Sequence, residues 1–306
     1  MAHRTEGRDR QAANAESEGS PLGPFIDPFL GNEFMMRALA AGVLVSVGCA
    51  IVGTFVVLRG LAFIGDALAH GVLPGVAASL LLGLPGILGA AVGAAVMIGG
   101  VSLVTQRSKL SSDSAIGLLF VGMLALGVVM VSGSSSFSGD LIAILFGQIL
   151  GVSPGGLALQ VVVTAAVAVV AFVCARPFLL LSFDPEQAQV SGFSARRYHA
   201  LMLLLVATVV VVSFQSVGTL LVFGMLLAPA ASGALIASRL GTMTAIAIMI
   251  GVISTYTGLL ISYGFNTAAG ATIVLVATVI FFGVLALVNV RAGLAARTSP
   301  AEEPAA

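Results

Sequence analysis

The stretch FIGDALAHGVLPG, Phe63 to Gly75, places an aspartate and a histidine inside a segment that is otherwise apolar. Asp66 and His70 are four residues apart, so on a helix their side chains lie on one face, a turn from each other. Ionisable residues are costly in membrane hydrocarbon, and those found there usually serve a function. A carboxylate and an imidazole together suit a divalent ion such as zinc, manganese or iron. The pair is therefore a candidate metal site, and a structural Asp–His hydrogen bond between two helices is the alternative.

The residues after the pair predict a break in its helix. Gly71, Pro74 and Gly75 follow His70, and a proline removes one backbone hydrogen bond from a helix. Such a break leaves backbone carbonyl groups free beside the pair. We interpret these three residues as a helix break with a role in gating.

The composition indicates an all-α polytopic membrane protein. Of the 306 residues, 58% are hydrophobic and only 8% are charged, whereas soluble domains have about 25% charged residues. The formal net charge is zero, which gives no reason to expect a nucleic-acid partner. The sequence has no Walker A motif, so any ATPase that drives the protein must be a separate chain.

Nine apolar stretches approach the roughly 20 residues that a membrane-spanning helix needs. They cover residues 34–58, 61–83, 86–105, 115–132, 155–181, 198–214, 218–238, 243–263 and 268–290. A further stretch, Asp140–Gly151, is too short to span and is predicted as a re-entrant half-helix. We therefore expect a disordered polar tail without a signal peptide (1–33), a transmembrane domain (34–290) and a short cytoplasmic tail (291–306).

The positions of lysine and arginine predict the orientation. Cations occur in the connections after spans one, three, five and seven and after the last span, while the other connections have none. Because cytoplasmic loops are enriched in lysine and arginine, this alternation places the C-terminus in the cytoplasm. With nine spans the N-terminal tail lies outside, and a count of eight or ten would reverse that side.

The longest polar connection, Ser182–Arg197, contains a predicted short helix. Asp184 can cap its N-terminus, Pro185 suits its first position and Gly192 can end it. A capped helix on the cytoplasmic face can dock a partner protein, and it can equally be an ordinary connector. Beyond this segment, His199 is isolated from other candidate ligands.

The stretch Gly218–Gly233, GTLLVFGMLLAPAASG, predicts a close-packed and kinked helix. Its small residues include Gly224, and Pro229 lies in mid-span. A pore-lining helix has this composition, and so does a helix that simply packs in the bundle, which the residues alone favour.

Five motifs occur in register between Arg37 and Val290, which is nearly all of the folded chain. They are GTFVVLRGLAFIGDALAHGVLPG (53–75), SSDSAIGLLF (111–120), LFGQILG (145–151), SFDPEQAQVSGF (182–193) and VGTLLVFGMLLAPAASG (217–233). Together they resemble the membrane-spanning permease subunit of bacterial ABC importers for zinc, manganese or iron(II). Any one of these motifs alone would be weak evidence for the family.

The resemblance implies roles for individual residues. Asp66 and His70 would line the translocation path and coordinate or gate the transported divalent metal ion, with no permanently bound cofactor. The coupling helix, which docks on a separate cytoplasmic ATPase, would include Phe183, Asp184, Pro185, Glu186, Ala188 and Gly192. The chain would then be a transport subunit and not itself an enzyme.

The resemblance also implies partners and a location. It predicts a permease homodimer over two ATPase subunits in the lipid of a bacterial plasma membrane, supplied by an extracellular or periplasmic metal-binding protein. Family members commonly carry an acidic residue and a proline in the segment where this chain reads Asn266–Gly270, which contains neither. Asn266 is instead predicted as a turn residue. The motifs do not name the metal.

The polar residues in the membrane also suit two other classes of protein. An ion-coupled secondary transporter could use Asp66 and His70 as a proton relay, but it would not need the capped cytoplasmic helix. An intramembrane hydrolase is disfavoured because neither a nucleophile motif nor an HExxH zinc site lies near His70.

Overall fold

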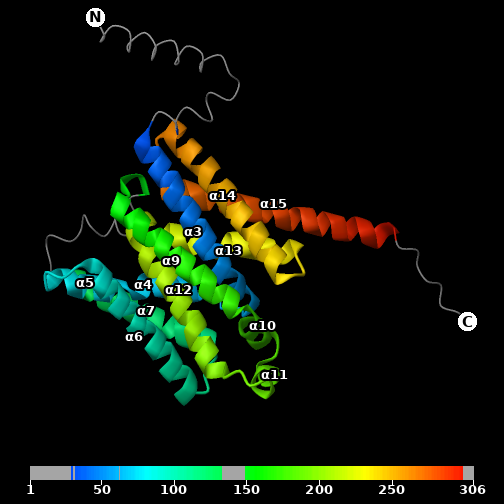
Figure 1. Cartoon of the computed structure of the whole chain (residues 1–306), viewed down its shortest axis with the longest axis horizontal. Coiled ribbons are helices and arrows are strands. Elements are labelled where there is room, and N and C mark those ends of the chain that lie inside the picture. Colours follow the sequence, from blue (N-terminus) through cyan, green and yellow to red (C-terminus); the bar gives the residue numbers. More distant parts are fainter. Residues whose placement is uncertain (1–28, 30–31, 62, 133–148, 299–306) are drawn as a thin grey trace, which may run out of the picture.

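A computed structural model describes residues 29, 32–61, 63–132 and 149–298 of the chain. All regular elements in these ranges are helices (Figure 1): α3 (Glu33–Leu58), α4 (Phe63–Gly71), α5 (Leu73–Leu81), α6 (Gly86–Arg107), α7 (Ser112–Ser132), the 3₁₀ turn η1 (Ile149–Gly151), α9 (Pro154–Val173), α10 (Ala175–Phe183), α11 (Pro185–Val190), α12 (Ala195–Val217), α13 (Thr219–Ile236), α14 (Leu240–Phe265) and α15 (Ala269–Thr298). Most of the predicted N-terminal tail (1–33) and most of the predicted half-helix Asp140–Gly151 lie outside the described residues.

The helices confirm a polytopic all-α membrane protein. Within the described ranges, eight helical segments are long and apolar enough to cross a membrane, and α13 contains a shorter apolar helix, Leu220–Ile236. These segments follow the order of the nine predicted spans, with α4 and α5 together forming the second.

One predicted boundary was wrong. The fifth predicted span, 155–181, is divided at Cys174 into α9 and α10. Pro177 has no N–H to donate to the carbonyl group of Val173, which accounts for the end of α9 at that residue. The last predicted span, 268–290, is confirmed by the apolar segment Ala269–Arg291, and its helix continues to Thr298 because the residues there, RAGLAART, are mostly good helix formers.

Helix α3 lies at the centre of the bundle and contacts α9, α12, α13 and α14 (Figure 1). In hydrocarbon, helices associate through close packing and interhelical hydrogen bonds. Gly53 of α3 lies directly against the backbone carbonyl group of Leu226 in α13. The hydroxyl groups of Ser46 in α3 and Thr255 in α14 are 3.0 Å apart. Small residues and buried hydroxyl groups thus hold this centre together.

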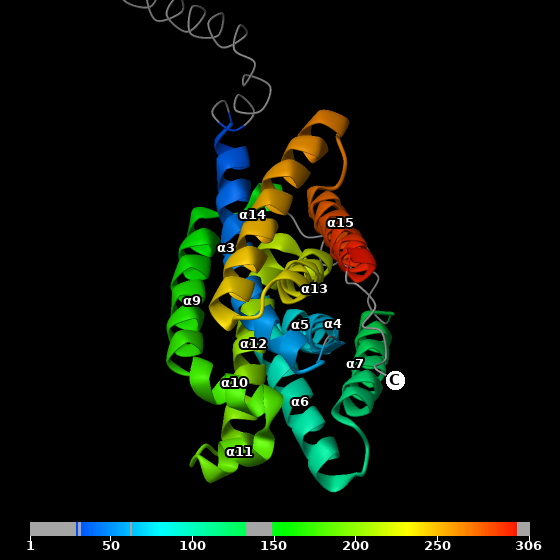
Figure 2. The same ribbon diagram turned by 90° about the vertical axis from the view of Figure 1, so that its right-hand side faces the viewer.

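Helices α4 to α7 form a second group beside α12. Helix α5 packs on α6, and both α4 and α5 pack on α7. Figure 2 shows α4, α5 and α13 nearly end-on, while α3, α6, α9 and α12 run lengthwise, so α4 and α5 cross the long helices.

A glycine turn directs the chain from α3 into α4. Gly60 has a φ of +65°, in the left-handed region that glycine adopts without steric cost. The N–H of Gly60 donates to the carbonyl of Val57 (3.1 Å) and that of Leu61 to the carbonyl of Val56 (3.0 Å), which is the Schellman pattern. This turn sets the start of the helix that carries Asp66.

Candidate functional site

Asp66 and His70 lie on one face of α4, as their spacing predicts. His70 Nε2 and Asp66 Oδ1 are 3.4 Å apart, and the two side chains are 21% and 31% exposed. The rest of the helix supplies the packing face, because Ile64, Ala67 and Leu68 are buried. The structure therefore holds both polar groups in an apolar helix while leaving each partly accessible.

The distance within the pair suits a shared metal ion. Two ligand atoms that are each about 2.1 Å from a tetrahedral ion lie about 3.4 Å apart. The separation of 3.4 Å between Nε2 of His70 and Oδ1 of Asp66 matches that edge, and an octahedral ion such as manganese would need the two atoms a few tenths of an ångström closer. No cluster of three or more His, Cys, Asp or Glu side chains is found among the described residues, so these residues do not complete a ligand set.

Helix α7 covers one side of the His70 ring. The ring of Phe120 meets it edge to face, with the ring centroids 5.6 Å apart. Nδ1 of His70 is buried and has no hydrogen-bond partner among the described residues. Nε2, the nitrogen beside Asp66, is therefore the ring atom best placed to bind an ion.

The predicted helix break is present. Helix α4 ends at Gly71 and α5 begins at Leu73, with Pro74 in its first turn. Gly71 contacts the side chain of Met97 in α6, and Gly75 lies against the backbone of Gly89 in the same helix. The residues of the break directly after His70 thus pack closely on α6.

Gly224 and Pro229 lie in α13, which packs against α4. A side chain at Gly224 would overlap Val274 of α15, and Pro229 is buried inside α13. Leu226, between them, reaches Gly65, the residue before Asp66. Both residues therefore take part in packing within this chain, and the helix that they belong to supports the residue next to Asp66.

The predicted capped helix is confirmed as α11. Oδ1 of Asp184 accepts hydrogen bonds from the N–H groups of Glu186 (3.0 Å) and Gln187 (2.9 Å). Pro185 occupies the first turn, and Gly192, with a φ of +85°, ends the helix in the left-handed region. These interactions define a short and rigid element at the end of the bundle (Figure 2).

The surface around α11 is partly apolar. Ala188 is fully buried against the bundle, whereas Phe183 is 72% exposed and Val190 is 84% exposed. Glu186 is also exposed. Beside Phe183 lies a cavity of about 490 Å³, which Arg239 also lines. This end of the molecule therefore presents apolar side chains, a hollow and charged groups together.

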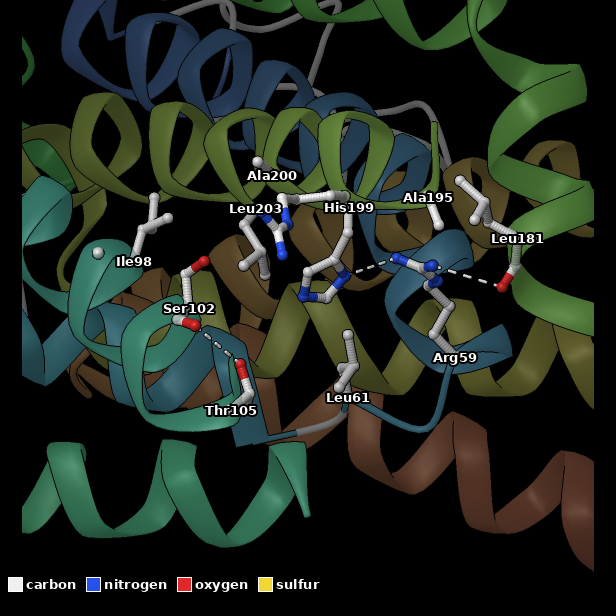
Figure 3. A pocket seen from close by; sticks show the side chains of 12 residues that line it. Arg59, Leu61, Ile98, Ser102, Thr105, Leu181, Ala195, His199, Ala200 and Leu203 are labelled. Carbon is white, nitrogen blue, oxygen red and sulfur yellow. Dashed lines mark hydrogen bonds between the residues drawn. The ribbon is translucent and has the colours of Figure 1, made fainter. Parts of the chain in front are cut away.

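Arg59 and His199 form a contact that the sequence did not indicate (Figure 3). Arg59 Nη1 lies 2.9 Å from Nδ1 of His199, and Nη2 donates to the carbonyl group of Leu181 at 3.3 Å. Arg59 follows α3, Leu181 lies in α10 and His199 in α12, so one guanidinium joins three helices. Burial lowers the pKa of Arg59, but a guanidinium stays protonated in proteins. In the sequence, His199 is isolated from other candidate ligands, and Arg59 contributes only to the prediction of membrane orientation.

We expect Arg59→Leu to lower the free energy of unfolding by about 1–3 kcal/mol, because the carbonyl of Leu181 and Nδ1 of His199 lose their donor. Thermal unfolding of the purified protein in detergent measures the change. Arg197→Leu, at an exposed position in the same part of α12, is the matched control. Equal unfolding temperatures for the two variants would contradict this prediction.

The sequence profile of the ABC 3 transport family matches residues 31–288. The chain belongs to the ABC 3 transport family. This ABC 3 family permease is 38% identical to the manganese transport system membrane protein MntC of Halalkalibacterium halodurans, over 84% of this chain and 88% of the relative. It is 35% identical to a probable iron transport system membrane protein of Haemophilus influenzae, over 85% of this chain and 95% of the relative.

A solved structure has the same fold. PsaBC from Streptococcus pneumoniae, in complex with Fab, superposes on the ABC 3 family permease with a TM-score of 0.76 and 37% identity. The match covers 85% of this chain and 94% of the other. Family and fold therefore agree that this is a multi-span membrane transport subunit.

Proposed function

We propose that the chain is the membrane permease subunit of an ATP-driven ABC importer for a divalent transition-metal ion, with Asp66 and His70 as the ion-binding pair. The observation that carries this proposal is the 3.4 Å separation of a carboxylate oxygen and an imidazole nitrogen inside a membrane helix of an ABC 3 family protein. The names of the relatives point to manganese or iron as the cargo rather than zinc.

The pair supplies two ligands, so a bound ion needs others. In a homodimer a second Asp66 and a second His70 could approach from the other copy, and water can fill any remaining position. The break at Gly71, Pro74 and Gly75 would let α4 tilt relative to α5. A small tilt would move both ligands together and so open or close the binding position.

Helix α11 is proposed to couple the permease to a cytoplasmic ATPase. The support is its capped ends, its buried Ala188 anchor and the exposed Phe183 and Val190 beside it. In this arrangement the C-terminus and α11 face the cytoplasm of a bacterial cell, and a metal-binding protein delivers the ion on the outer side. The separate ATPase subunit hydrolyses ATP.

Metal uptake tests the function directly. A bacterial strain without its own manganese and iron importers would express the chain together with its ATPase and binding protein. We expect manganese or iron to accumulate and the accumulation to stop when the ATPase is inactivated. Uptake that continues without the ATPase would contradict an ABC importer and support an ion-coupled carrier.

We expect Glu186→Lys to reduce recovery of the ATPase with the purified permease by about tenfold, because a reversed charge on the docking helix opposes a complementary surface. Co-purification from membranes measures it. Glu33→Lys, at the start of α3, is the control with the same charge change far from α11 along the chain. Full recovery of the ATPase with Glu186→Lys would count against the coupling role of α11.

A further inference from the structure

A groove runs between α6 and α12 and contains two cavities. The larger cavity has a volume of about 590 Å³ and lies where the end of α6 meets the start of α12. The smaller one, of about 210 Å³, lies further along the same two helices. Ile98 of α6 lines both, so they are neighbouring parts of one groove.

The larger cavity is cationic. Arg59, Arg196 and His199 line it, and its described lining residues include neither aspartate nor glutamate. Figure 3 shows His199 between Arg59 on one side and the hydroxyl-bearing Ser102 and Thr105 of α6 on the other. A guanidinium has five N–H donors, so the bonds of Arg59 to His199 and Leu181 leave it able to bind a further acceptor.

Two further features favour an anion in this cavity. The N-cap residue of α12, Ser194, makes no side-chain hydrogen bond to the helix, and Ala195 and Arg196 of the first turn line the cavity. The positive end of the α12 dipole is therefore directed toward this cavity. Arg59 also donates to Nδ1 of the neutral His199 ring, so the ring's own N–H is on Nε2 and available to an acceptor.

The smaller cavity is apolar and is open because the side chains around it are small. Ala91, Ala94 and Ala95 of α6 face Ala207 and Thr208 of α12. Leu204 at its edge is 54% exposed, and Val92 and Val96 on the outer face of α6 are also exposed. In a membrane-spanning helix such a face meets the hydrocarbon of the bilayer.

The length of the groove matches one membrane leaflet. From Arg196 to Val212 the rise along α12 is about 24 Å, at about 1.5 Å per residue. Half of a bilayer's hydrocarbon core is about 15 Å thick, and the head groups add several ångströms. An acyl chain in the apolar part and a head group in the cationic part would fill this length.

We propose that the groove between α6 and α12 binds an anionic phospholipid, with its phosphate between Arg59, Arg196 and His199 and an acyl chain along Ala95 and Ala207. This proposal goes beyond the proposed transport function and does not depend on it. A free phosphate would explain only the cationic cavity, whereas a lipid accounts for the apolar continuation as well. Basic pockets between membrane helices bind anionic head groups in this way.

The full chain, purified in detergent and depleted of lipid, would be titrated with phosphatidylglycerol or phosphatidylcholine, and bound lipid counted by native mass spectrometry. We expect phosphatidylglycerol to bind at least about fivefold more tightly than phosphatidylcholine. Arg196→Gln should weaken phosphatidylglycerol binding about fivefold, and Arg197→Gln, the same change at the next exposed residue, should not. Ala95→Phe should weaken both lipids, and Val96→Phe neither.

Several outcomes would overturn the proposal. Equal binding of the two lipids, or equal effects of Arg196→Gln and Arg197→Gln, would remove the head-group site. Displacement of phosphatidylglycerol by millimolar inorganic phosphate would indicate a free-phosphate site instead. Absence of bound lipid together with a change of oligomeric state in Ala95→Phe would show that a second copy of the chain covers the groove. Unfolding temperatures equal to that of the unmodified protein establish that each variant is folded.

Discussion

His70→Ala and Asp66→Asn are each expected to lower the initial rate of manganese or iron uptake at least about 100-fold. Substitutions of residues that only orient a metal ligand already reduce metal affinity about 10–100-fold, so loss of a ligand itself should exceed that. Asp66→Asn is nearly isosteric and keeps an oxygen acceptor, but it removes the negative charge that favours a divalent cation. Uptake of radioactive metal into cells that contain equal amounts of each permease measures the effect.

Asp113→Asn provides the matched control, because it makes the same chemical change at an exposed position near the start of α7. Thermal unfolding separates the ion-binding role from a structural one. Both side chains belong to α4, so their contact does not join two helices. If it served only to stabilise α4, both substitutions would lower the unfolding temperature. Unchanged uptake in either His70→Ala or Asp66→Asn would show that the pair does not bind the ion.

Gly75→Val is expected to destabilise the permease by about 3 kcal/mol or more. A Cβ atom on Gly75 would overlap the backbone carbonyl of Gly89, and one on Gly89 would overlap that of Gly75. The neighbouring atoms are backbone, so they cannot move aside as a side chain can, and α5 must separate from α6. Overpacking that shifts backbone costs about 1–3 kcal/mol or more.

The unfolding temperature in detergent and the amount of protein in the membrane report this loss. Gly122→Val in α7 is the control, because a Cβ atom there has no neighbour within 4 Å among the described residues and the change in helix propensity is the same. Equal unfolding temperatures for Gly75→Val and Gly122→Val would mean that α5 and α6 are not packed as closely as described. Separation of α5 from α6 should also reduce uptake, since α4 leads directly into α5.

Features set by neighbouring residues could be predicted from the sequence. The break after His70, the Asp184 cap of α11 and the turn at Asn266 each follow from local chemistry, and the structure has all three. Asn266 adopts the left-handed conformation, with a φ of 53°, which asparagine tolerates better than most residues. The fifth span was predicted too long because its apolar residues continue past Val173, whereas Pro177 interrupts the helix there.

Contacts between distant parts of the chain could not be predicted. Arg59 and His199 are 140 residues apart, and neither has a neighbour in sequence that indicates the other. The contact of Gly75 with Gly89 depends on how α5 crosses α6, which the pattern of small residues allows but does not determine. The groove of the proposed lipid site was missed for the same reason, because its two walls are separate helices that are each unremarkable in sequence.

The Gly60 turn lies between the proposed ATPase-coupling helix α11 and Asp66 of the proposed ion-binding pair. Arg59 contacts the carbonyl of Leu181 in α10, directly before α11, and Asp66 follows Arg59 by seven residues. Of that stretch only Phe63 to Asp66 belong to α4, and four helical residues extend about 6 Å. A displacement imposed on α11 would therefore reach Asp66 through the Arg59 side chain, the Gly60 turn and about one turn of helix. In the proposed importer, a backbone rotation at Gly60 would therefore change both the contact of Arg59 with α10 and the position of the helix that carries Asp66.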